Sequence, residues 1–184
     1  MSTPNPNGPA KRSVAGHFRI SENVYAALQR EADRQMVSLN TLVNQVLYNH
    51  AYQEVPISKG LFVMMPKSVF QEFLAAVTEE KLRQIAQDDV QSIARSLILA
   101  RHGKITTDAI VEDLHLYATG AGYGEFGDVS DGGKRIVTIM HEFGQKGSVF
   151  FAAHAEALFQ LIGLRPVINV TSGGIIMEIT PPRT

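Results

Sequence analysis

The most constraining feature of this chain is a strand-forming stretch, Val14–Ser21, that has no second strand within reach along the sequence. Its alternation places Phe18 and Ile20 on one face of an extended backbone. No hairpin partner follows it, and a lone strand leaves its backbone N–H and C=O groups unpaired. The simplest partner is the same strand from a second copy of the chain, so the sequence predicts a homodimer.

Two short helices are predicted directly after this strand. Ser21 is expected to cap the first, which runs from about Glu22 to Gln35 with a repeating apolar face. After a break, Ser38 is expected to cap a second helix that reaches about Tyr52. A strand and two helices of this length bury too little surface to be stable alone, which again favours a dimer.

These residues resemble a known family. The segments His17-Phe-Arg-Ile-Ser-Glu-Asn-Val24 and Ser38-Leu-Asn-Thr-Leu-Val43 resemble the ribbon–helix–helix DNA-binding domain of the Arc and methionine repressors. The resemblance covers about residues 13–52, and Ser38-Leu39-Asn40 stands where that family begins its second helix. It implies an obligate dimer whose two-stranded antiparallel ribbon lies in the major groove of double-stranded DNA.

The resemblance also implies which residues contact DNA. The ribbon face opposite the apolar one would meet the base edges, and it carries Ala15, His17 and Arg19. An arginine there can donate two hydrogen bonds to guanine O6 and N7, whereas the alanine offers only a methyl group. Phosphate contacts are expected from the chain before the strand and from the free N–H groups at the start of the second helix, namely at Lys11, Arg12, Ser38, Leu39 and Asn40.

Charge is distributed unevenly along the chain. The formal net charge is −1, yet residues 1–53 hold five basic and three acidic residues, against twelve basic and fifteen acidic residues in 54–184. A slightly basic front on an acidic body is compatible with a front segment that meets phosphate.

Composition excludes several other classes of protein. The chain of 184 residues has no cysteine, which excludes disulfides, thiolate nucleophiles, cysteine zinc sites and iron–sulfur clusters and fits a cytoplasmic protein. No apolar run approaches the roughly 20 residues of a membrane span, so we expect no membrane association. Residues 1–12 are rich in Pro, Asn, Ser and Thr and are expected to form a flexible tail rather than a signal peptide.

The remainder, residues 57–184, is predicted to be a separate α+β domain after the ribbon–helix–helix domain at 13–53. A helical segment comes first, and a glycine-rich loop at Gly120–Gly133 follows it. The chain is then expected to close with a βαββ unit. Its elements are a strand at Arg135–His141, a helix at Ser148–Gly163 with Ser148 as its cap, and strands at Val167–Thr171 and Ile175–Ile179.

The chemistry of this second domain is less defined. The segment His141-Glu-Phe-Gly-Gln-Lys-Gly-Ser148 resembles uncharacterised, chiefly archaeal, proteins that also begin with a ribbon–helix–helix, a group that implies no function. His141, Glu142 and His154 lack a recognisable metal-ligand spacing, and Asp128 and Asp131 do not match a calcium loop. We therefore predict no metal, no cofactor and no catalytic residue.

Together these features favour a sequence-specific DNA-binding transcriptional regulator, a repressor, that is not an enzyme. Its C-terminal domain would oligomerise or respond to a protein or small-molecule effector. Two alternatives remain open at this stage. One is an antitoxin whose C-terminal domain binds a toxin, and the other is a C-terminal enzyme or metal sensor tethered to DNA.

Overall fold

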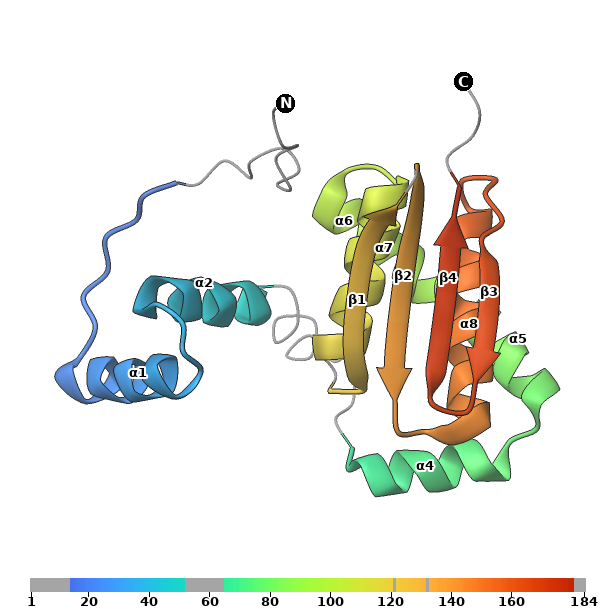
Figure 1. The fold of residues 1–184 in the computed structure, drawn as a ribbon, viewed down its shortest axis with the longest axis horizontal. Helices are drawn as coiled ribbons and strands as arrows, with labels where there is room; N and C mark the ends of the chain where they lie inside the picture. Colours follow the sequence, from blue (N-terminus) through green and yellow to red (C-terminus); the bar gives the residue numbers. More distant parts are fainter. Residues whose placement is uncertain (1–13, 52–64, 121, 132, 181–184) are drawn as a thin grey trace. The chain divides into compact units, whose positions relative to one another are not determined.

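The computed structural model describes residues 14–51, 65–120, 122–131 and 133–180 (Figure 1). The chain divides into two compact units, residues 1–47 and 48–184, and each is described by itself. The expected tail at 1–12 lies outside the described residues.

The structure confirms the two predicted helices as α1 (Glu22–Arg34) and α2 (Leu39–Asn49), and unit 1 contains α1 and most of α2. Ser21 precedes α1 in an extended conformation, although its side chain makes no capping hydrogen bond. Ser38 does cap α2, because its Oγ accepts a hydrogen bond of 3.0 Å from the backbone N–H of Thr41. Met36 in the turn between the helices has a φ of 55°, which ends the first helix sharply.

The predicted strand before α1 does not form within one copy of the chain. Residues 14–20 are irregular and exposed, and they pair with no described segment. A strand is defined by its hydrogen bonds to a neighbour, and a ribbon made between two copies has no neighbour inside a single one.

Unit 2 begins with helices, which confirms the predicted helical segment. Thr78 caps the second of them through a 3.3 Å bond from the Lys81 N–H, and Gly103, with a φ of 69°, ends the third. Thr106 caps the next helix, since its Oγ1 accepts a hydrogen bond of 3.2 Å from the Ala109 N–H. The helical elements are α4 (Lys67–Ala76), α5 (Glu79–Asp89), the π-helical turn η2 (Val90–Ala94), α6 (Arg95–His102), α7 (Thr107–His115), the π-helical turn η3 (Leu116–Gly120) and α8 (Gly144–Gln160).

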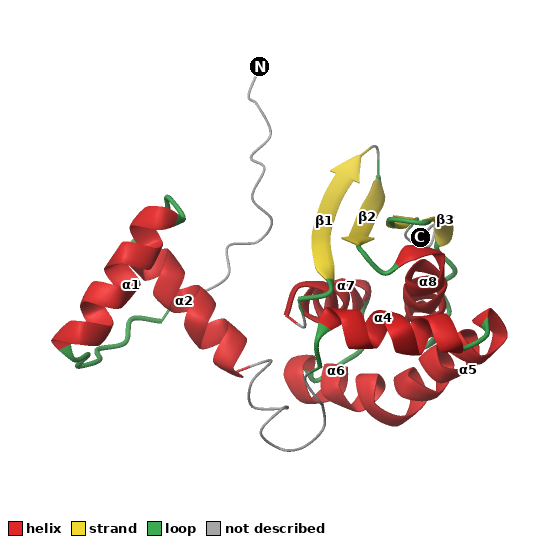
Figure 2. Cartoon of the chain, turned by 90° about the horizontal axis from the view of Figure 1, so that it is seen from below, coloured by secondary structure: helices red, strands yellow, loops and turns green. Residues whose placement is uncertain are grey.

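A four-stranded antiparallel sheet completes unit 2 and confirms the α+β class. Its strands are β1 (Gly124–Asp131), β2 (Lys134–His141), β3 (Val167–Thr171) and β4 (Gly174–Ile179), in the order β1-β2-β4-β3. The C-terminal part is therefore ββαββ and not the predicted βαββ. Figure 2 shows the sheet on one side of the unit and the helices on the other.

The extra strand, β1, corrects the prediction of a loop at Gly120–Gly133. Its glycines are read as turn formers in the sequence, yet two of them serve close approach to β2. A Cβ on Gly124 would overlap the carbonyl oxygen of Met140, and one on Gly127 would lie 2.5 Å from the Thr138 Oγ1. Glycine is thus compatible with a strand here, because the β2 backbone lies close to Gly124 and the Thr138 side chain lies close to Gly127.

The start of α8 is a second correction. The sequence predicts Ser148 as the helix cap, but α8 begins at Gly144, and Ser148 lies inside it, fully buried. The hydroxyl lies 3.1 Å from His141 Nε2 and 3.5 Å from the Gly144 carbonyl oxygen, to which it donates, so it caps no N–H group of the helix.

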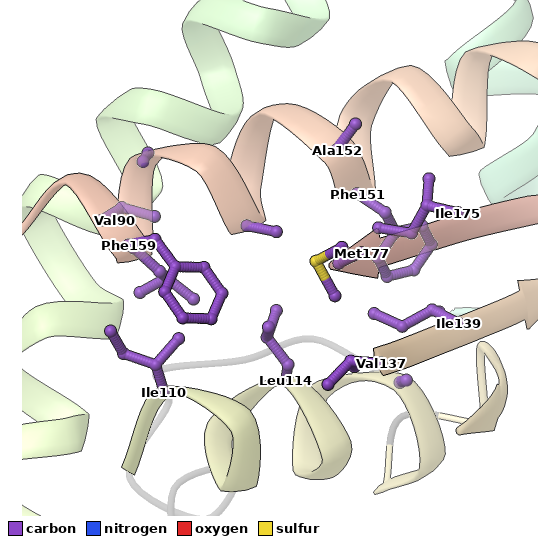
Figure 3. Packing of buried hydrophobic residues seen from close by; sticks show 14 of the residues in the cluster. Val90, Ile110, Leu114, Val137, Ile139, Phe151, Ala152, Phe159, Ile175 and Met177 are labelled. Atoms are coloured by element: carbon purple, nitrogen blue, oxygen red, sulfur yellow. The ribbon is translucent and has the colours of Figure 1, made fainter. Parts of the chain in front are cut away.

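The core of unit 2 lies between the sheet and the helices (Figure 3). Phe151 and Phe159 of α8 are at most 1% exposed, and complete burial of such a side chain contributes roughly 1.5–3 kcal/mol. The sheet supplies alternate residues of β2 and β4, and α7 supplies two further side chains; these are Val137, Ile139, Ile175, Met177, Ile110 and Leu114.

Candidate functional site

The three residues predicted to face DNA bases lie in the exposed segment that precedes α1. Ala15, His17 and Arg19 are all exposed to solvent. The two predicted phosphate contacts further upstream, Lys11 and Arg12, lie outside the described residues. These exposed side chains are accessible to a ligand. They would share one face only if the backbone formed a strand, in which alternate side chains point to the same side.

The other predicted phosphate contacts meet at the first turn of α2. Ser38 and Asn40 are exposed and Leu39 is half-buried. The Ser38 hydroxyl is occupied as the cap, since it also lies 2.8 Å from the Thr41 Oγ1. The first N–H groups of a helix have no partner within it, so those of Leu39 and Asn40 are the donors available here to an anion.

Unit 1 leaves much of its apolar surface uncovered. Among residues 14–51 the fully buried apolar side chains are Ala32 and Leu42. By contrast, large apolar side chains at the end of the extended segment and the start of α1 are 43–72% exposed; they are Phe18, Ile20, Val24 and Tyr25. Such a cluster on a soluble unit typically marks an interface.

In unit 2 the predicted cap Ser148 forms a buried pair with His141. The backbone N–H of Phe143 donates to His141 Nδ1 at 3.1 Å, which assigns the proton of the neutral ring to Nε2. That Nε2 lies 3.1 Å from Ser148 Oγ and donates to it. Burial lowers the pKa of His141, which keeps the ring neutral. Activation of a serine needs the imidazole to accept its proton, so this pair locks β2 to α8 and does not form a nucleophile–base couple.

Two of the carboxylates considered for cation binding, Asp128 and Glu142, have other partners. Asp128 receives two hydrogen bonds from Arg135, at 2.8 and 2.6 Å, and Glu142 on the surface lies 3.4 Å from Lys67 Nζ. The described part of the chain contains no group of three or more potential metal-ligating His, Asp or Glu side chains.

A buried polar cluster lies where α5, η3 and α8 meet. His154 is 0% exposed, and neither of its ring nitrogens has a hydrogen-bond partner among the described residues. Its Nδ1 is 3.5 Å from Asp89 Oδ2, and its ring stacks on Tyr117 at a centroid distance of 4.8 Å. Burial lowers the pKa of His154 to about 4 and raises the pKa values of Asp89 and Tyr117. The histidine is therefore neutral at pH 7.

A buried ion pair stands beside this cluster. Asp113 of α7 accepts a short hydrogen bond from Arg101 of α6, and the side chains of both are nearly buried. Burial raises the pKa of Asp113 to about 6 even though the Arg101 charge opposes the shift. The charge of Arg101 thus lies against Asp113.

A pocket of about 280 Å³ opens beside the cluster. Its walls come from α4, α5, η3, the residue before β1, and α8, and both α4 and α5 pack against α8 (Figure 2). The lining is largely aromatic with one carboxylate and includes Phe70, Phe73, Asp89, Tyr117, Tyr123 and Phe150.

Sequence reasoning missed Asp89 and Asp113, although a signal was present. Asp89 lies seven residues after Leu82, and Asp113 three after Ile110, so each acidic residue occupies an apolar helix face. A charged residue at such a position is a candidate for burial, and burial of a charge requires a specific environment.

Comparison with family models, curated proteins and solved structures found no match to this chain in any of the three. Within the described residues, none of the helices combines the length and the apolar character needed to cross a lipid bilayer.

Proposed function

We propose that this chain is a dimeric, sequence-specific DNA-binding transcriptional regulator of the ribbon–helix–helix type, acting as a repressor. The observation that carries the proposal is the uncovered apolar cluster of unit 1, formed by Phe18, Ile20, Val24 and Tyr25, next to an unpaired extended segment. A second copy of the same unit would supply both an apolar surface and a strand partner.

The pairing follows from backbone chemistry. Two antiparallel copies of residues 14–21 can exchange their N–H and C=O groups, and the side chains of such a ribbon alternate between its faces. Phe18 and Ile20 would then turn towards the helices of both copies. Ala15, His17 and Arg19 would turn outwards, in a ribbon narrow enough for the major groove of DNA.

The affinity for DNA and the sequence specificity would come from different groups of the protein. The free N–H groups of Leu39 and Asn40 suit a DNA phosphate, which positions the dimer without reading sequence. Arg19 is the group best suited to read a base, through paired hydrogen bonds to guanine. A dimer held across a promoter in this way would exclude other proteins from that DNA, which is how a repressor acts.

The proposal is tested by selecting binding sites from a random pool of double-stranded DNA with the full-length protein. We expect enrichment of a two-fold symmetric motif, because a symmetric dimer presents the same reading surface twice. Sedimentation of the free protein should show a dimer. A monomer that enriches no motif would contradict the proposal.

Substitutions then separate reading from assembly. Arg19→Ala should lose about 1–3 kcal/mol for the selected site in each half and leave random DNA nearly unaffected. The matched control is Arg30→Ala, which removes the same charge from an exposed position on α1. Phe18→Ala should weaken the dimer itself, by about 3 kcal/mol if the side chain is buried between copies. Equal loss of specificity in the two arginine variants would contradict base reading by Arg19.

A further inference from the structure

The pocket of unit 2 has the features of a binding site for a small molecule. Its volume of about 280 Å³ is close to the lower end of the range found for ligand sites, roughly 300–1,000 Å³. It suits a compact ligand and is too small for a folded partner. Phe73, on its wall, is 59% exposed, so the pocket can be reached from solvent.

Asp89 gives the pocket its polarity. Its side chain is 25% exposed among mainly apolar and aromatic neighbours. Among the described residues the polar group that the structure places beside this carboxylate is His154 Nδ1, at 3.5 Å, and that ring is neutral at pH 7. Arg101, the buried cation of the neighbouring pair, bonds to Asp113. Within the described parts of the chain this carboxylate therefore has no cationic partner, and the ammonium group of a ligand could provide one.

The backbone geometry is a second, independent indication that this pocket is a binding site. Asp89 immediately precedes the π-helical turn η2, and Tyr117 lies within the π-helical turn η3. Such turns interrupt regular helices and occur frequently at functional sites, where they redirect side chains. Here Asp89, directly before η2, and Tyr117, within η3, both line the pocket.

We propose that this pocket binds a small organic cation, an amine on an apolar body, whose ammonium group pairs with Asp89 and whose body lies against the aromatic walls. The faces of tyrosine and phenylalanine rings attract cations, which adds to the ion pair. Tyr123, stacked on Phe70 at 5.2 Å, and Tyr117 offer such faces. An anionic ligand of the same shape would be repelled by Asp89. Binding in unit 2 goes beyond the proposed DNA-binding role and does not depend on it.

The experiment titrates the full-length protein with three probes that share a phenyl ring and differ in charge: 2-phenylethylamine, 2-phenylethanol and phenylacetate. Binding is followed by NMR chemical shifts. We expect the amine to bind at least tenfold more tightly than the alcohol, and phenylacetate to bind most weakly. Shifts should concentrate on α4, α5 and η3. No DNA is present, so the result does not depend on whether the protein binds DNA.

Two variants locate the site. Asp89→Asn keeps the shape and removes the charge, so it should abolish the tenfold preference for the amine over the alcohol. The matched control is Asp88→Asn, at the neighbouring exposed position on α5, which should keep that preference. Phe73→Ala alters the wall at a position that is 59% exposed, and it should weaken the amine and the alcohol by a similar factor of several-fold.

Three results would overturn the proposal. They are the absence of amine binding at millimolar concentration, equal affinities for the amine and the alcohol in the parent protein, and an unchanged preference in Asp89→Asn. Should Asp89→Asn fail to fold, the Phe73→Ala result decides, because amine binding outside the pocket would be insensitive to it.

Discussion

Replacement of His154 by phenylalanine should make unit 2 more stable, by an amount that depends on pH. The parent buries two ring nitrogens without hydrogen-bond partners among the described residues, next to Tyr117 and Asp89. An unsatisfied buried polar group costs about 1–3 kcal/mol, and a phenyl ring of similar size removes it and keeps the stacking. At pH 7 we therefore expect His154→Phe to stabilise unit 2 by about 1–2 kcal/mol.

Acidification should increase this difference. The pKa of His154 falls from 6.5 to about 4 on folding, so between these values the unfolded chain binds a proton that the folded chain excludes. The parent is therefore fully stable above pH 6.5 and loses stability as the pH falls towards 4. At pH 5 the loss is about 2 kcal/mol, and the variant does not share it.

The assay compares urea unfolding of the two full-length proteins at pH 7, 6 and 5, with NMR signals of α8 as reporters of unit 2. Taking the difference between proteins removes the effect of Asp113, whose raised pKa stabilises the folded state as the pH falls. His115→Phe makes the same exchange at an exposed position on α7 and is the control for the substitution itself. A His154→Phe difference that does not grow between pH 7 and pH 5 would refute the burial of a neutral imidazole.

Two further predictions concern packing in unit 2. Gly124→Ala should destabilise unit 2 by about 1–3 kcal/mol or more, because the new Cβ meets the Met140 backbone. Gly127→Ala should cost less, because the Thr138 side chain can rotate away from the new Cβ. Thermal unfolding followed by circular dichroism compares the two variants. Asp113→Ala should cost up to about 3–5 kcal/mol, because it removes the carboxylate that pairs with the nearly buried Arg101 guanidinium. Arg101→Met combined with Asp113→Leu should recover much of that loss in the same assay.

The helices could be predicted from the sequence because each carries its own signals. Apolar residues repeat along α1 and α5, Ser38 and Thr78 cap helices, and Gly103 ends one. The strands β2, β3 and β4 were likewise visible as short apolar runs between turn residues.

The errors arose where long-range contacts override local signals. In the sequence the glycines of β1 indicate a turn. In the structure a Cβ at these positions would meet the Met140 carbonyl oxygen or the Thr138 side chain of β2. The sequence around Ser148 is typical of a helix cap, yet the Ser148 hydroxyl forms a hydrogen bond with His141, seven residues earlier in the chain. The pocket joins α4, α5, η3 and α8, and no local pattern along the chain could bring Asp89, Tyr117 and Phe150 together.

Hydrogen exchange at residues 14–20 tests the central proposal, a ribbon shared by two copies, most directly. In one copy these residues are exposed and unpaired, whereas in a two-stranded antiparallel ribbon alternate N–H groups point to the partner strand. We expect slow exchange at alternate amides of this segment in the full-length protein at micromolar concentration, and loss of that protection in Phe18→Ala. Exchange of all these amides at the rate of an unstructured peptide, while the amides of α1 remain protected, would contradict it.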